Sequence, residues 1–222
     1  MELDYLLIII SLLLTVGAQI LVSVRYSKYK SIKNSKGVSG SEVAIDMLKE
    51  HGLDDIYVVE CRGNLTDHYD PSGKVIRLSS DIFHGESIAS LAVAAHEIGH
   101  AIQYKEGNVL IKIRSFIYPL VSLASNFSYI AILLGLILGI LELFYVGVAL
   151  FAIILLFQLL TLPVEIDASK KAMKNLKVKY LSDRELDGAH SMLVAAAMTY
   201  VASLATTVIQ LIRLILMGSR RD

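Results

Sequence analysis

The chain has 222 residues, of which 55% are hydrophobic and only 19% charged, and its mean hydropathy is +0.58. This composition is typical of a membrane protein and excludes an ordinary soluble domain. Lysine and arginine (21) balance aspartate and glutamate (21), so no overall positive field exists to attract nucleic acid, and nucleic-acid binding is not expected.

The first predicted element is a membrane-spanning helix at the N-terminal end, over residues 1–24. Its apolar stretch, residues 5–24, is long enough to cross a hydrocarbon core of about 30 Å at about 1.5 Å per residue. The chain opens with two acidic residues, Glu2 and Asp4, whereas a cleavable signal peptide opens with basic ones. The sequence therefore predicts a retained transmembrane helix.

A polar region, residues 25–115, follows and is predicted to form a small cytoplasmic domain. It is lysine-rich at its start, residues 25–37, and the positive-inside rule places such a segment on the cytoplasmic side. The lone Cys61 excludes an internal disulfide and reads as an ordinary strand residue. The expected elements are a helix capped by Ser39 or Ser41 and closed by Gly52, a strand over 55–63, a turn at 70–73, a strand over 74–78 and a helix over 85–104.

Three more apolar stretches meet the length of a spanning helix, at residues 116–141, 143–162 and 191–217. Only Glu142 separates the first two, which predicts a transmembrane hairpin, residues 116–163, with its tip at Glu142. Residues 164–190 contain a second lysine-rich stretch and are predicted to be cytoplasmic, and residues 218–222 form a short tail. The predicted fold is a mainly α membrane protein (α+β) with four transmembrane helices and a small β-hairpin or sheet.

The motif His96-Glu97-Ile98-Gly99-His100 lies in the middle of the helix predicted over 85–104. Residues four apart share a helix face, so His96 and His100 can converge on one metal ion, with Glu97 placed to act on a water there. The alternative is a solvated charge pair on a surface helix. Alanine, valine and isoleucine surround the motif, which disfavours that alternative, because buried charged groups need a partner or a metal.

A catalytic zinc site needs a third protein ligand. Glu165 follows the third apolar stretch directly, and Pro163 before it suits the first turn of a new helix or a kink. The hairpin leaves and re-enters the same membrane face, which brings Glu165 back toward the histidine pair. The alternative is that Glu165 and Asp167 are merely acidic residues at the membrane interface.

Four stretches, "AAHEIGHAIQ", "DHYDPSGKVIRLS", "LPVEIDAS" and "AAAMTYVA", resemble those of the YugP-like membrane-bound zinc metallopeptidases of prokaryotes. The likeness covers nearly the whole chain in the same order. More distantly, the chain is similar to the integral-membrane gluzincins of the HtpX type. This resemblance implies a zincin-like domain in the prokaryotic plasma membrane, with Zn²⁺ held by His96, His100 and Glu165. In the distant relatives a Glu-x-x-x-Asp pattern supplies an outer carboxylate, which falls on Ser169 here, and Asp167 is the substitute.

The expected function is zinc-dependent cleavage of peptide bonds, in which Glu97 acts as general base on a zinc-activated water. The expected substrates are membrane or membrane-proximal proteins, docked as an extended strand on an exposed edge of residues 74–78. Candidates for stabilising the oxyanion are selected by residue type alone: His68, Tyr69, His84 and His190.

Two other functions compete with this one. A catalytically silent zinc-binding scaffold or chaperone-like protein would keep the metal for structure, and the intact Glu97 argues against it because a structural site needs no base. A transporter would carry ionisable residues inside its spans, whereas only Glu142 and Arg213 occur there, both near span ends.

Overall fold

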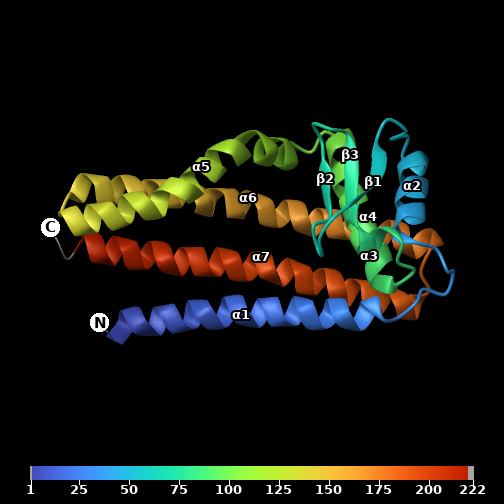
Figure 1. Cartoon of the computed structure of the whole chain (residues 1–222), viewed down its shortest axis with the longest axis horizontal. Helices are drawn as coiled ribbons and strands as arrows, with labels where there is room; N and C mark the ends of the chain where they lie inside the picture. Colours follow the sequence, from blue (N-terminus) through green and yellow to red (C-terminus); the bar gives the residue numbers. More distant parts are fainter. Residues whose placement is uncertain (1, 220–222) are drawn as a thin grey trace. The chain divides into compact units, whose positions relative to one another are not determined.

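The computed structural model describes residues 2–219 and is mainly helical, with one small sheet (Figure 1). It divides into two compact units. The first, here called the membrane unit, combines the N-terminal residues through Gln19 with Lys112–Pro163 and the residues from Met198 onward. The second, here called the site unit, comprises Ile20–Ile111 and Val164–Ala197. Each of the four long helices has residues in both units, so each unit is built from segments far apart in the sequence.

Four helices are long and apolar enough to cross a membrane, which confirms the four predicted spans. They are α1 (Glu2–Lys30), α5 (Val109–Leu138), α6 (Leu141–Lys179) and α7 (Asp183–Gly218). Each helix extends beyond the apolar stretch that predicts it. The second lysine-rich stretch, residues 169–180, lies almost entirely in α6. Ala168, Ala172 and Leu176 recur there every four residues and are fully buried, as on one face of a helix.

The break between α5 and α6 lies at Gly139–Ile140, so the predicted hairpin tip at Glu142 is wrong by a few residues. Gly139 has φ +68°, a left-handed conformation that glycine adopts without steric cost at a helix C-terminus. Glu142 instead occupies the first turn of α6, where a carboxylate interacts favourably with the helix dipole. The turn chemistry of glycine, rather than the break in hydrophobicity, therefore ends the helix.

The site unit contains the shorter helices and a three-stranded sheet. Helix α2 (Gly40–Glu50) begins at the N-cap Ser39, whose side chain and that of Glu42 form a capping box. A short helix, α3 (Ser80–Phe83), precedes α4 (Ile88–Lys105), which carries the histidine motif behind the N-cap Ser87. The strands are β1 (Tyr57–Cys61), β2 (His68–Asp70) and β3 (Val75–Ser79), and Figure 1 shows them beside one another.

The order of the sheet is β1-β3-β2, with β3 parallel to β1 and antiparallel to β2. Strand β3 therefore has a partner on both sides, and the predicted docking of an extended peptide along residues 74–78 is wrong. Strand β2 is not among the predicted elements, because its three residues are too short to show an alternating pattern.

Helices α4 and α6 lie close together at Gly99. A Cβ atom added there would lie 2.6 Å from the backbone oxygen of Ala168 and 3.1 Å from its Cα. Both neighbours are backbone atoms, so no side chain can rotate to make room. The glycine of the HEIGH motif therefore fixes the distance between the helix of the histidines and the helix of Glu165.

We expect Gly99→Ala to lower the free energy of unfolding by about 1–3 kcal/mol, the usual cost of overpacking a core. The matched control is Gly17→Ala in α1, where an added Cβ would meet nothing within 4 Å. The control should be neutral or slightly more stable, because alanine favours a helix over glycine by about 1 kcal/mol. Thermal unfolding of both variants in detergent measures the effect, and equal midpoints would contradict a close contact between α4 and α6.

Candidate metal centre

His96, His100 and Glu165 come together in the site unit, the first two from α4 and the third from α6. Ligand atoms of the three side chains all lie within 4.8 Å of one another. Oε2 of Glu165 is 3.1 Å from Nε2 of His96 and 3.6 Å from Nε2 of His100. The Glu165 side chain is only 3% exposed, and the two imidazole side chains are 16% and 9% exposed. Three potential ligands thus converge in a protected position.

The other ring nitrogen of each histidine faces away from Glu165 and has its own partner. Nδ1 of His96 lies 3.2 Å from Oγ of Ser169, and Nδ1 of His100 lies 3.0 Å from Oε1 of Gln103. An amide oxygen only accepts, so Nδ1 of His100 must carry the proton and donate it. With that proton on Nδ1, a neutral His100 would present its Nε2 to a metal as a lone pair, which is the form a metal requires.

Gln103 is a site residue that the sequence analysis missed. Its side chain is fully buried, and its Nε2 donates to the backbone oxygen of Val164 at 2.8 Å and to Oδ2 of Asp167 at 2.7 Å. It therefore connects His100 to the turn of α6 that carries Glu165. The available signal was a glutamine three residues after His100 in an otherwise apolar stretch, where a buried amide needs partners.

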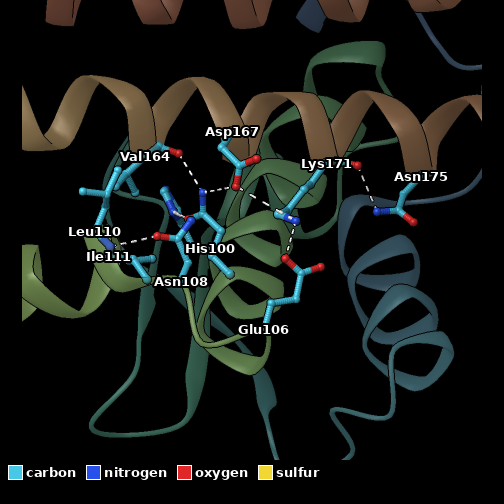
Figure 2. Close-up of polar contacts among 10 residues, drawn as sticks. His100, Glu106, Asn108, Leu110, Ile111, Val164, Asp167, Lys171 and Asn175 are labelled. Carbon is cyan, nitrogen blue, oxygen red and sulfur yellow. Dashed lines mark hydrogen bonds and ion pairs between the residues drawn. The ribbon is translucent and has the colours of Figure 1, made fainter.

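The two outer residues predicted from the resemblance occupy different places. Ser169 contacts His96 directly, whereas Asp167 contacts Gln103 and reaches His100 only through it. Asp167 also lies 4.0 Å from Nζ of Lys171. Figure 2 shows Asp167 and Lys171 along α6, with Lys171 directed at Glu106 where α4 ends. The hydroxyl of Ser169 thus lies beside Nδ1 of His96, at the position where the resemblance implies a carboxylate.

Glu97 is buried, with 8% of its surface exposed, and lies next to the first histidine on α4. The backbone N–H of Tyr69 in β2 donates to its Oε2 at 3.0 Å. The uncharged N–H of Tyr69 therefore fixes the position of the Glu97 carboxylate. This hydrogen bond also occupies the N–H that Tyr69 would need to bind a further strand at that point of β2.

The four oxyanion candidates selected by residue type are distributed unevenly. Tyr69 is adjacent to Glu97 through its backbone, and its ring packs edge-on against Tyr104 at 5.6 Å between centroids. The other three are not brought to the cluster by any contact in the described residues: His68 contacts Thr66, His84 contacts Glu60, and His190 is exposed on α7.

The electrostatics of the cluster keep Glu165 ionised. Burial by itself raises the pKa of this carboxyl, but hydrogen bonds with His100 and His96, and the field of both rings, outweigh burial and hold the pKa well below its ordinary value. Glu165 is therefore an anion at neutral pH, which is the protonation state of a carboxylate ligand.

The donor set fits zinc. Two imidazole nitrogens and one carboxylate oxygen are ligands that Zn²⁺ accepts, and three protein ligands leave one position for water or substrate, as in catalytic rather than structural sites. The outer partners of both rings are the kind that orient histidine ligands. The residues present can therefore hold the ion that the motif predicts.

The fold and this cluster define a helical membrane protein with a buried His-His-Glu group on two packed helices. The chain belongs to the family described as "Putative neutral zinc metallopeptidase", whose profile matches residues 4–219. It is 39% identical over 211 residues to the "Putative membrane protease YugP" of Bacillus subtilis (strain 168), an alignment covering 95% of this chain and 94% of that protein. No solved structure matches the chain.

Proposed function

We propose that this protein is a membrane-integrated, zinc-dependent endopeptidase. The observation that carries the proposal is the convergence of His96, His100 and Glu165, with Glu97 held beside them by the backbone of β2. Family membership and the likeness to a protein described as a membrane protease support the same reaction class.

His96, His100 and Glu165 would hold the zinc ion in this proposal. When bound, zinc supplies a Lewis acid that polarises a peptide carbonyl and makes water more acidic. Glu97 then accepts a proton from the attacking water and delivers it to the nitrogen of the leaving amine. The N–H of Tyr69 holds one oxygen of Glu97, so the other oxygen is the one that exchanges the proton.

The remaining residues keep the ligands in place. Gln103 and Ser169 direct the Nε2 atoms of His100 and His96 toward the ion, and Gln103 also links α4 to α6. Because these partners fix the orientation of both imidazole rings without metal, zinc binding should need little further ordering of the side chains. In this assignment Asp167 acts on the site only through Gln103.

We further propose that the site unit faces the cytoplasm of a prokaryotic cell, as residues 25–115 and 164–190. The exposed lysines of the lysine-rich part of α6 support this orientation, because basic residues next to spans favour the cytoplasmic side. The substrates in this proposal are membrane or membrane-proximal proteins.

Metal removal tests the proposed function. Purified protein is expected to contain one zinc per chain by elemental analysis, and a chelator should abolish hydrolysis of unfolded casein. Adding back zinc should restore the rate, because the ligands form a preorganised site. Full hydrolysis by protein shown to be free of metal would reject the proposal, whereas bound zinc with no hydrolysis of any protein would favour a zinc-binding scaffold.

A further inference from the structure

The membrane unit contains a cavity of about 450 Å³ between α5, α6 and α7, here called the polar cavity. Polar side chains from all three helices line it, although these helices are apolar enough to cross a membrane. Polar groups within membrane-spanning helices are costly and usually serve a function. The lining groups used below are Ser122, Ser125, Asn126, Gln158, Thr161 and Ser203.

Two of these side chains have hydrogen-bonding capacity that the described residues do not satisfy. Thr161 is 4% exposed, and its Oγ1 is buried without a hydrogen-bond partner. Oε1 of Gln158 is also buried and without a partner, although its Nε2 donates to Oγ of Ser203 at 3.0 Å. An unmet buried polar group carries a free-energy cost. A ligand with its own donors would remove that cost.

The spacing of the polar groups indicates the shape of such a ligand. On α5 the lining runs from Arg114 to Asn126, about 18 Å along the axis at about 1.5 Å per residue. A lipid headgroup gathers its polar atoms at one end of the molecule. An extended polypeptide instead presents a donor and an acceptor at each residue, about every 3.3 Å, so about five residues match the length of the lining.

The apolar part of the lining suits side chains of the same ligand. The rings of Tyr118 and Phe157 lie 6.3 Å apart between centroids, and Val121 and Ile154 also line the cavity. A peptide from a membrane-spanning segment carries mostly apolar side chains, which these groups can accept. The cavity thus offers hydrogen bonds for a backbone and apolar walls for side chains.

We propose that the polar cavity binds an unwound stretch of a substrate's membrane-spanning segment. In hydrocarbon an unwound backbone must find hydrogen bonds, and the cavity supplies them. This inference rests on the proposed peptidase function, because cleavage requires a helical segment to be opened. In the chain, Thr161 precedes Glu165 by four residues on the same helix, α6.

The test uses the full-length protein in lipid nanodiscs, with Glu97→Gln introduced so that binding is measured without hydrolysis. The two probes are synthetic spanning peptides of about 20 apolar residues, one an uninterrupted helix and one with a central Asn-Pro-Gly. We expect the interrupted probe to bind roughly tenfold more tightly, a modest factor because single hydrogen bonds in membranes are individually weak. The double variant Thr161→Val with Gln158→Leu removes the proposed partners and should abolish that difference in affinity. The matched control, Thr15→Val, lies in the membrane unit outside the lining of this cavity and should change nothing.

A second measurement does not depend on polar groups being removed. With copper phenanthroline added as the oxidant, Ser125→Cys in a Cys61→Ser background should form a disulfide with an interrupted probe that carries a central cysteine, and Thr15→Cys should not. Equal binding of the two probes, or equal disulfide yields at both positions, would overturn the proposal. Phosphatidylglycerol retained by the native protein and lost in Arg114→Gln, without discrimination between the peptides, would assign the cavity to a lipid and also overturn it.

Native protein separates this inference from the proposed function. If it binds the interrupted probe preferentially but cleaves no protein, the cavity proposal stands and the peptidase proposal fails. If it cleaves both casein and the spanning peptides, with no preference that depends on Thr161 and Gln158, the peptidase proposal stands and the cavity proposal fails.

Discussion

Glu97→Gln is expected to slow peptide hydrolysis severely without loss of zinc binding. Glutamine has nearly the same shape and can still accept the N–H of Tyr69 through its amide oxygen, so the fold around position 97 should survive. An amide cannot accept a proton from water at neutral pH. Loss of the base should lower kcat by about 100- to 10,000-fold, the usual contribution of general acid–base catalysis.

Zinc content and casein hydrolysis, measured on the same preparations, check this expectation. Glu86→Gln is the matched control, because Glu86 lies just before α4 and pairs with Lys33 at the surface. The control should retain both zinc and the native rate. A Glu97→Gln variant that digests casein at the native rate would defeat the peptidase assignment, because Glu97 is its proposed base.

Glu165→Ala is expected to lower zinc affinity by more than roughly 100-fold, the upper end of the loss seen when only an outer partner of a metal ligand is removed. The carboxylate supplies one of three proposed ligands and the negative charge that balances the ion. Two imidazoles alone leave the ion more exposed to water and to exchange. Hydrolysis should fall to background at zinc concentrations that saturate the native enzyme.

Competition with a chromophoric chelator measures the affinity. Asp187→Ala removes a carboxylate from an exposed position on α7 and should leave zinc binding unchanged. Thermal unfolding of the metal-free proteins shows whether the Glu165 variant still folds, because a collapsed fold would also lose zinc. If a folded Glu165→Ala variant bound zinc with native affinity, Glu165 would not be a zinc ligand.

The histidine pair and Glu165 are accessible to sequence reasoning because each depends on a strong regularity. His96 and His100 are four residues apart in a helix, and that spacing alone places them on one face. Glu165 follows from membrane length, since two spans of the required size return the chain to the face it left. These regularities survive without any knowledge of side-chain packing.

Gln103, Ser169 and β2 depend on contacts between distant segments. The partner of Gln103 on α6 is 61 residues away at Val164, and nothing near it in the chain indicates that contact. Strand β2 forms only because β3 is present to pair with it, and its three residues carry no pattern of their own. The ends of the long helices are also not predicted from the sequence. Hydrophobicity marks only their apolar parts, whereas alanine and lysine, both good helix formers, continue the helices beyond them.

The division of the proposed metal centre between α4 and α6 determines when, during synthesis, its ligands can meet. His96 and His100 leave the ribosome first, and Glu165 follows His100 by 65 residues, with α5 and the apolar part of α6 between them. A nascent chain that has released only the HEIGH helix lacks the carboxylate. The three proposed ligands therefore cannot come together during synthesis until α5 and the apolar part of α6 have also been made.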